Sequence, residues 1–377
     1  MEPMSPYRSW VEVSRSRIAD NFHAIRTLVG PQVEVMPVVK ADAYRHGAVE
    51  VSRVLTAEGA AWLAVGNVEE GVALRQAGIT AHILVMADFL PVERSALIEY
   101  DLTPVIHSLE DLAEWDRLAD TANAPLRYHL KIDTGMGRLG TQAPARTIVE
   151  AIQAARHATI EGVMTHFASA GDYSSGQTER QTGAFRAICV RLDQAGIHPR
   201  YVHMSSTIPL GYGRRETWAN MVRPGHAIYG YVSPARGEAP ARILQVKPAL
   251  SWKATILAVK DVPEGASIGY GAMHIATHTT RIAVLAVGYA DGLPHRLSNR
   301  GRVIAGGKYA PILGAVSMDL TTIDISQSPQ LRPGDSVTII GSEGDCDIDA
   351  QQLARLAGTI SYSVLCGITS RVKRVYL

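Results

Sequence analysis

The chain has 377 residues, which is enough for two or three ordinary domains, or for one barrel of about 250 residues with a further domain. Its 37 lysine and arginine residues are balanced by 36 acidic residues, which excludes the basic excess expected of a protein that binds nucleic acid or an anionic membrane. Three scattered cysteines, Cys189, Cys346 and Cys366, exclude a disulfide framework and a paired-thiol zinc site. We therefore expect a small-molecule ligand and predict no metal site.

In chain order, the first feature is the N-terminus, which lacks the apolar core of a signal peptide. No later stretch approaches the run of about 20 apolar residues that spans a membrane, so we predict a cytoplasmic protein with no membrane partner. Residues 1–11 precede the first periodic segment and are available to add a strand to a second domain.

From about residue 12 to residue 240, short apolar runs alternate with segments of helical period. Eight strands are predicted, at 33–40, 61–65, 82–86, 102–106, 127–133, 160–167, 200–204 and 221–230. Helices lie between them, such as the one that begins at Val68 and is ended by Gly78. Repeated strand and helix units of this number predict an α/β fold, a (β/α)8 barrel of the TIM type.

The composition changes to proline, glycine and alanine at 233–240, which indicates a linker. We therefore predict a barrel domain at 1–240 and a second domain at 241–377. The second domain contains strands separated by turn signals and one convincing helix, near 350–357, so it should be mostly β.

Polar residues lie where the predicted barrel strands end, which is where barrel enzymes have their active sites. Lys40 ends the first strand, Arg138 follows the fifth, and His166 lies near the end of the sixth. A lysine that ends a valine-rich strand suggests a buried amine that acts as a nucleophile or a base. The alternative is a lysine that simply extends into solvent.

The segment Lys40-Ala41-Asp42-Ala43-Tyr44 resembles the pyridoxal phosphate (PLP) attachment motif of alanine racemases. Segments at 130–140, 203–207, 222–225, 267–272, 288–292, 317–319 and 361–363 resemble further motifs of that family in the same order. The resemblance covers nearly the whole chain, from Trp10 to Val375.

The resemblance implies that Lys40 binds PLP and that Lys40 and Tyr270 are the two catalytic bases. Cofactor contacts are implied for Tyr44, His166, Ser206, Thr207, Arg223, Gly225, His226 and Tyr362, and substrate contacts for Arg138 and Met318. Lys131 is the position where the family often has a carbamylated lysine that holds the arginine in place. Tyr289 and Asp319 are implied to support the site.

The chain departs from the commonest motifs at a few positions. Asp42 and Arg45 replace asparagine and glycine, Ser206-Thr207 replaces asparagine-serine, and His226 replaces a small aliphatic residue. A threonine hydroxyl can still bond a phosphate oxygen, and the loops after the last two barrel strands are the usual phosphate site. His226 either adjoins the cofactor or is an ordinary core or surface residue.

By the same resemblance, Arg223 faces the pyridine nitrogen of PLP. A guanidinium donates hydrogen bonds but hardly gives up its proton, so the ring nitrogen should stay largely unprotonated. Such a cofactor is a weaker electron sink than one protonated by an aspartate, and this favours racemisation over transamination or decarboxylation.

The resemblance thus predicts an alanine racemase that interconverts L- and D-alanine through a PLP external aldimine and supplies D-alanine for peptidoglycan. Lys40 would serve one face of the substrate and Tyr270 the other, with His166 and Arg223 as a cationic network that stabilises the tyrosine phenolate. It also implies a head-to-tail homodimer with shared active sites, in which the small-molecule amino acid binds.

Three alternatives remain open. A serine or broad-specificity racemase would share the catalytic residues and differ near Tyr289, Met318 and Tyr362. A barrel-type PLP decarboxylase would lack the Tyr270 motif, and a non-enzymatic PLP carrier would leave the second domain unexplained.

Overall fold

The computed structural model describes residues 7–87 and 89–377, which form two compact units. One unit contains Ile18–Ala43 and Ala48–Lys247. The other joins Tyr44–Gly47 and Pro248–Leu377 to the N-terminal segment that ends at Arg17. Part of the segment expected to add a strand, residues 1–6, lies outside the described residues. Within the described ranges, no helix combines the length and apolar character that crossing a membrane requires.

The first unit is a parallel barrel. Its strands are β2 (Glu34–Val35), β3 (Trp62–Val65), β4 (His82–Val85), β5 (Thr103–Ile106), β6 (Arg127–Lys131), β7 (Thr159–Met164), β8 (Tyr201–His203) and β9 (Met221–Val222). They pair in the order β2-β9-β8-β7-β6-β5-β4-β3, and a parallel bridge between Val38 and Ala64 links the two ends of the sheet. The predicted eight-stranded α/β barrel is therefore confirmed.

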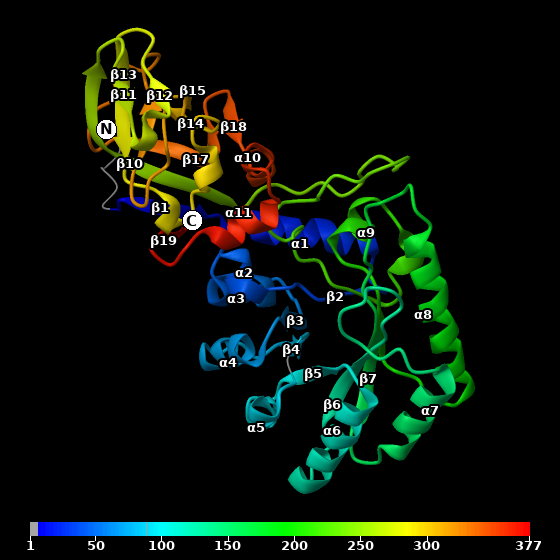
Figure 1. Cartoon of the computed structure of the whole chain (residues 1–377). Coiled ribbons are helices and arrows are strands. Elements are labelled where there is room, and N and C mark those ends of the chain that lie inside the picture. Colours follow the sequence, from blue (N-terminus) through cyan, green and yellow to red (C-terminus); the bar gives the residue numbers. More distant parts are fainter. Residues whose placement is uncertain (1–6, 88) are drawn as a thin grey trace. The chain divides into compact units, whose positions relative to one another are not determined.

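Helices surround the strands of this unit (Figure 1). They are α1 (Arg15–Val29), α2 (Lys40–Tyr44), α3 (Ala48–Ala57), α4 (Val68–Gln76), α5 (Arg94–Glu99), α6 (Leu109–Ala122), α7 (Ala145–Ala154), α8 (Gln177–Gln194) and α9 (Thr207–Gly211), with short 3-10 turns η1 (Pro91–Glu93) and η2 (Arg215–Thr217). In α6, the Ser108 hydroxyl accepts a hydrogen bond from the Asp111 amide at the N-terminus, and Asn123 ends the helix at φ 47°. Leu112 and Trp115 recur at helical spacing and are buried against the barrel unit's core.

Two predicted strands are much shorter than expected. The strand predicted at 33–40 is reduced to β2, which ends at Val35. We predicted a strand at 221–230, but β9 ends at Val222. The following residues turn instead, with the Ile228 amide donating to the Gly225 oxygen at 2.9 Å. Pro224 cannot donate to a ladder, which ends the strand there.

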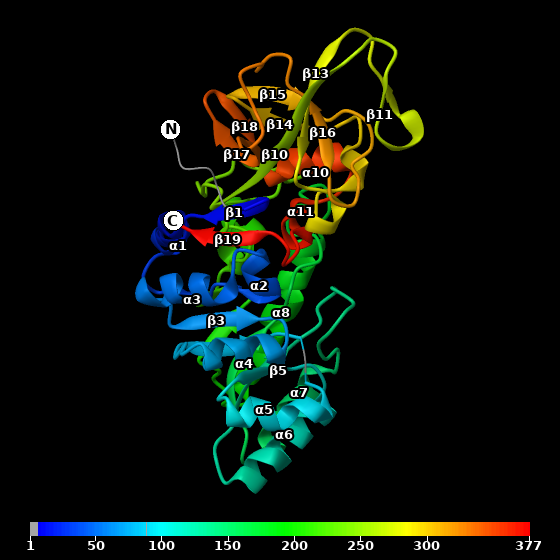
Figure 2. The same ribbon diagram turned by 90° about the vertical axis from the view of Figure 1, so that its left-hand side faces the viewer.

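The second unit is mostly β, as predicted. Its strands are β1 (Ser9–Val13), β10 (Leu250–Val262), β11 (Ser267–Ile268), β12 (His274–Ile275), β13 (Thr280–Leu285), β14 (Arg302–Ala305), β15 (Lys308–Pro311), β16 (Thr321–Asp324), β17 (Ser336–Glu343), β18 (Cys346–Ile348) and β19 (Lys373–Tyr376). Nine of them form one sheet, in which β1 pairs with β10 antiparallel and with β19 parallel (Figure 2). The N-terminal segment thus contributes a strand to this unit.

This unit has more helix than the sequence indicated. The expected helix is α10 (Ala350–Ala357), and α11 (Ser361–Gly367) follows it after a left-handed Gly358. Short 3-10 turns are η3 (Tyr270–Ala272), η4 (Tyr289–Asp291) and η5 (His295–Leu297). The prediction of a single helix is wrong because seven residues are too few to show a helical period.

The units divide between Lys247 and Pro248, later than the linker composition suggested. Residues 237–247 lie in no helix or strand, but they stay on the barrel unit. The Asn21 side chain accepts from the Lys247 amide and donates to its oxygen, both at 2.9 Å. The Ile243 amide donates to the Gly211 oxygen at 2.9 Å. Such tertiary hydrogen bonds leave no mark on composition.

Candidate active site

Lys40 begins a left-handed turn directly after the first barrel segment. Residues 41–45 all have φ between 52° and 66°, a region that residues other than glycine rarely adopt in succession. The Ala43 amide donates to the Val39 oxygen at 2.8 Å, and the Asp42 carboxylate accepts from the Ala48 amide at 2.8 Å. Lys40 itself is exposed, so the expectation that its amine is buried is not met in this chain.

Glu70 fixes this turn, and sequence reasoning missed it. Its carboxylate accepts from the amides of Ala41 at 2.6 Å and Gly66 at 2.7 Å. A Cβ at Gly66 would lie only 3.6 Å from the Cβ of Lys40, so the lysine packs along the glycine backbone. The signal available was Asn67 followed by Glu70, a helix-start pattern, but it predicts a local cap and not a bond to Ala41.

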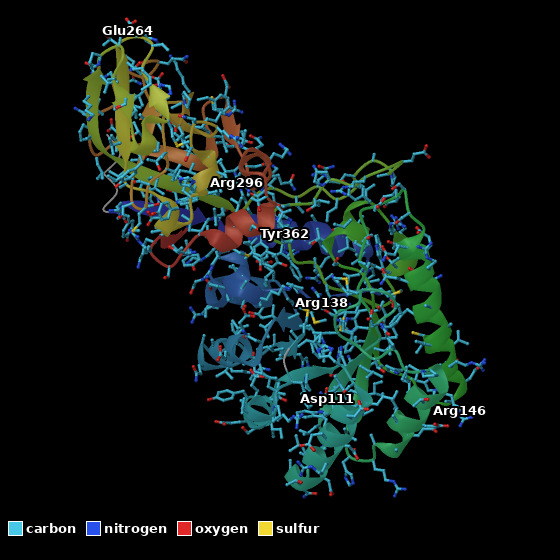
Figure 3. The ribbon with its side chains drawn as sticks, viewed as in Figure 1. Asp111, Arg138, Arg146, Glu264, Arg296 and Tyr362 are labelled. Atoms are coloured by element: carbon cyan, nitrogen blue, oxygen red, sulfur yellow. The ribbon has the colours of Figure 1, made fainter. Side chains whose placement is uncertain are left out.

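Tyr44 and Tyr362 lie together in the second unit. Their rings are 6.0 Å apart, with Tyr44 only 7% exposed and Tyr362 on α11 (Figure 3). Burial raises the pKa of Tyr44, with smaller effects from Tyr362 and Cys366, so its phenol stays protonated and can donate. The unusual Arg45 has φ 66°, and its Nε donates to the Cys366 oxygen at 3.3 Å.

The loop after β6 is shaped by Asp133. Its carboxylate accepts from the amides of Gly135, Met136 and Gly137 within 2.8–3.1 Å. The bend presents Arg138 at the surface of the barrel unit, where it is exposed (Figure 3). Lys131, on β6, is only 4% exposed, and burial followed by Arg138 and Arg223 lowers the pKa of its amine to about 8.

Arg223 is buried in the barrel with 3% exposure. One Nη2 hydrogen points to the Thr165 oxygen at 2.8 Å, and Nη1 lies 2.7 Å from Nδ1 of His203. His166 Nδ1 is 3.5 Å from Nη2. Burial, then Arg223 and the other cations, lowers the pKa of His166 to about 3, so this ring is neutral at physiological pH. The predicted cationic network therefore has its charge on Arg223, and the expectation of a charged His166 is wrong.

Thr207 links the two loops of the expected phosphate site. Its hydroxyl accepts from the amides of Gly225 at 3.2 Å and Ala227 at 3.1 Å. Both lone pairs of the hydroxyl are used, so the remaining hydrogen is available to an anionic oxygen. Ser206 precedes α9, and its side chain makes no bond to the start of that helix. His226 is buried and stacks on Tyr231 with ring centroids 5.0 Å apart, so it packs in the core.

Tyr270 lies at the tip of a turn in the second unit. Gly269 at φ 74° and Gly271 at φ 69° flank it, and both conformations strain any other residue. The tyrosine is 77% exposed in the described chain. The turn is tightly packed at its base, because a Cβ on Gly314 would lie 2.3 Å from the Ile268 oxygen.

Tyr289 and Met318 are brought side by side on the second unit. The Tyr289 amide donates to the Ser317 oxygen at 2.9 Å, and the Ala290 amide donates to the Met318 oxygen at 3.0 Å. Tyr289 is 44% and Met318 54% exposed. Asp319 accepts from Arg371 at 2.6 Å, which fixes the loop.

The predicted residues therefore form two groups, one on each unit. Lys40, Lys131, Arg138, His166, Ser206, Thr207, Arg223, Gly225 and His226 lie on the barrel unit, and Tyr44, Tyr270, Tyr289, Met318, Asp319 and Tyr362 lie on the second unit. The barrel group holds several basic side chains whose charges act on one another, with Asp133 as the acid that opposes them at Lys131. Such a group is suited to bind anions.

Two family models match the chain: alanine racemase, N-terminal domain, over residues 13–234, and alanine racemase, C-terminal domain, over residues 249–376. An alanine racemase of Halothermothrix orenii is 38% identical and covers 98% of this chain and 96% of its own length. The crystal structure of an alanine racemase from Streptomyces lavendulae is 32% identical, with a TM-score of 0.92 over 99% of this chain and 98% of that chain.

An alanine racemase from Bartonella henselae, solved with covalently bound pyridoxal phosphate, is 24% identical and has the same fold, with a TM-score of 0.86 over 99% of this chain and 100% of that chain. Fold alone does not give an activity, but the family models and the relatives above 30% identity agree over almost the whole length. The chain belongs to the alanine racemase family and is an amino-acid racemase.

Proposed function

We propose that the enzyme interconverts L- and D-alanine with PLP as cofactor and with Lys40 and Tyr270 as its two bases, and that it supplies D-alanine for peptidoglycan. The observation that carries this proposal is the basic group at the carboxyl ends of the barrel strands, where Lys40 and Arg223 lie with Arg138 and a buried Lys131. A cytoplasmic location remains a prediction.

The residues fit the cofactor. PLP has an anionic phosphate, a phenolic oxygen and a basic ring nitrogen, and each requires donors. The free hydroxyl hydrogen of Thr207 and the protonated phenol of Tyr44 suit phosphate oxygens, and Ser206 and Gly225 adjoin Thr207. Arg223 donates to the backbone oxygens of Thr165 and Met204 and to the ring of His203, all of them uncharged acceptors, so it suits a further acceptor such as the ring nitrogen. A related alanine racemase holds the cofactor covalently.

When bound, PLP withdraws electrons from the α-carbon of the amino acid and so acidifies the α-hydrogen. Lys40 would hold the cofactor covalently until substrate releases its amine, which can then take or return the α-proton on one face. Tyr270 would serve the opposite face. Arg138 would bind the substrate carboxylate through its planar guanidinium, with Met318 bordering the small methyl group.

In our proposal Tyr270, the second base, acts in the active site of a second subunit. Tyr270 is 77% exposed, and Tyr289 and Met318 on the same unit are also exposed. Exposed large side chains of this kind are typical of surfaces that other chains cover. We propose a head-to-tail homodimer in which Tyr270 of one subunit completes the site built around Lys40 of the other.

The experiment that tests the proposal is incubation with L-alanine in deuterated water, followed by chiral analysis of the product. We expect D-alanine with deuterium at the α-carbon, because the proton removed exchanges with solvent before return. Parallel incubations with L-serine and L-lysine separate an alanine enzyme from a broad-specificity one. Release of carbon dioxide, or the absence of D-alanine, would contradict the proposal.

We also propose that Lys131 is carbamylated. The pKa of the Lys131 amine is about 8, so at pH 8 about half of it is neutral and can add carbon dioxide. The carbamate anion formed would pair with Arg138.

Carbon-13 NMR with labelled bicarbonate should show a carbamate signal that is absent from Lys131→Ala. That variant should lose about 10- to 100-fold in kcat/KM, mostly through KM, because it loses the group that orients a substrate-binding arginine. A wild-type enzyme without the signal, and with unchanged kinetics in the variant, would contradict the assignment.

A further inference from the structure

A line of buried polar side chains runs through the inside of the barrel from Arg223. Its Nη1 lies 2.7 Å from Nδ1 of His203, and Nε2 of His203 lies 2.8 Å from Nδ1 of His129. Nε2 of His129 lies 3.9 Å from Oε2 of Glu161. Both histidines are fully buried, and Arg223 and Glu161 are 3% and 8% exposed.

The direction of each contact follows from the chemistry of the groups. Arginine only donates, so Nδ1 of His203 must accept and its proton must be on Nε2. That proton is donated to Nδ1 of His129, which places the proton of His129 on Nε2 as well. The Nε2 hydrogen of His129 then faces a carboxylate oxygen of Glu161. In all three contacts the donor hydrogen therefore points away from Arg223 and toward Glu161.

The backbone of this part of the barrel is built around the contact between the two histidines. In the pairing of β6 with β7, Tyr128 lies opposite Ile160 and His129 opposite Gly162, so a bulge leaves Glu161 without a partner in the ladder. A Cβ on Gly162 would lie 2.5 Å from Nδ1 of His129, closer than any real contact. The glycine is therefore required for the ring to reach His203.

The line ends at Glu161, on the side away from Arg223. Among the described residues, neither Nε2 of His129 nor Oε2 of Glu161 has a hydrogen-bond partner, although both are buried. At 3.9 Å their interaction is electrostatic and not a direct hydrogen bond. The other oxygen of Glu161 lies 3.8 Å from Arg127, which is exposed. Glu161 thus lies between the buried ring and the surface.

We propose that His203 and His129 are positioning residues, both neutral and protonated on Nε2 alone, which orient Arg223 toward the cofactor, and that the carboxylate of Glu161 stabilises this tautomer. Burial lowers the pKa of both rings, that of His129 to about 3, in agreement with neutral imidazoles. The effect on racemisation rests on the proposed role of Arg223 at the cofactor. The assignment of the two tautomers is independent of that role.

The test is NMR of the holoenzyme with nitrogen-15 in its histidine rings. We expect two neutral rings protonated on Nε2, assigned by their loss in His203→Asn and His129→Asn. Glu161→Gln keeps the shape and removes the charge, so the His129 signals should move toward a mixture of tautomers. His198→Asn removes an exposed histidine that pairs with Asp193 at 2.9 Å, and it should leave both signals unchanged.

Kinetic measurements then show whether His203 orients Arg223 or only fills space in the core. In His203→Asn the amide oxygen can still accept from Arg223, whereas His203→Leu offers no acceptor. We expect kcat to fall about 10- to 100-fold in the leucine variant with KM changed about twofold or less, and most of the loss to be restored in the asparagine variant. A charged ring, a proton on Nδ1 of His203, or equal activity in the two variants would overturn the proposal. Failure of racemisation in the wild type would instead contradict the proposed function.

Discussion

Lys40→Ala is expected to lower kcat for racemisation by about four orders of magnitude or more, because one side chain would hold the cofactor and serve as a base. The residue is exposed at the start of a left-handed turn held by Glu70, so its replacement should leave the fold unchanged. Lys308→Ala is a suitable control, since this exposed lysine donates to the Gln327 oxygen and is not among the residues proposed for the site. Circular dichroism of both variants should match the wild type.

The same variant tests where the cofactor is attached. Borohydride reduction of the wild type followed by peptide mapping should place a pyridoxyl label on the peptide with Lys40, and Lys40→Ala should give no label. Label on a different lysine in the wild type, or full activity in the variant, would show that Lys40 is not the attachment site.

Tyr270→Phe should lower racemisation by about two to four orders of magnitude, because it removes the hydroxyl proposed to serve one face of the substrate. Lys40 would still serve the other face, so the variant should exchange the α-hydrogen of one enantiomer with deuterated water without forming the other enantiomer. Tyr309→Phe, which removes an exposed hydroxyl that bonds to the Asp347 oxygen at 3.1 Å, should keep wild-type activity. Exchange of both enantiomers at wild-type rates in Tyr270→Phe would exclude it as a base.

The sequence predicts the barrel because its signals are local. Each barrel strand contains a short apolar run, several of these runs are followed by polar residues, and the periodic helices between them have clear ends. For this reason Lys40 could be assigned to a strand end, and Lys131 and Arg223 to the barrel strands, from the sequence. The second unit was predicted as mostly β because its turns contain proline and glycine, as at Pro263 and Gly265.

Other features depend on contacts between residues far apart in the chain. Glu70 lies 29 residues from Ala41, and His129 lies 74 residues from His203, so neither bond has a local pattern. The neutral state of His166 follows from burial beside Arg223 and could not be read from a Thr-His-Phe segment. The exposure of Lys40 was missed because the preceding valines indicate a buried strand but not where the next side chain points.

The measurement that tests the two-base, shared-site account most directly is a subunit exchange between Lys40→Ala and Tyr270→Phe. Mixed in equal amounts, half of the dimers should become heterodimers, each with one doubly altered site and one intact site, so activity should recover to about a quarter of the wild type. Native mass spectrometry confirms the exchange. If the exchanged mixture remains as inactive as the two parent variants, Lys40 and Tyr270 do not complete one site from different subunits.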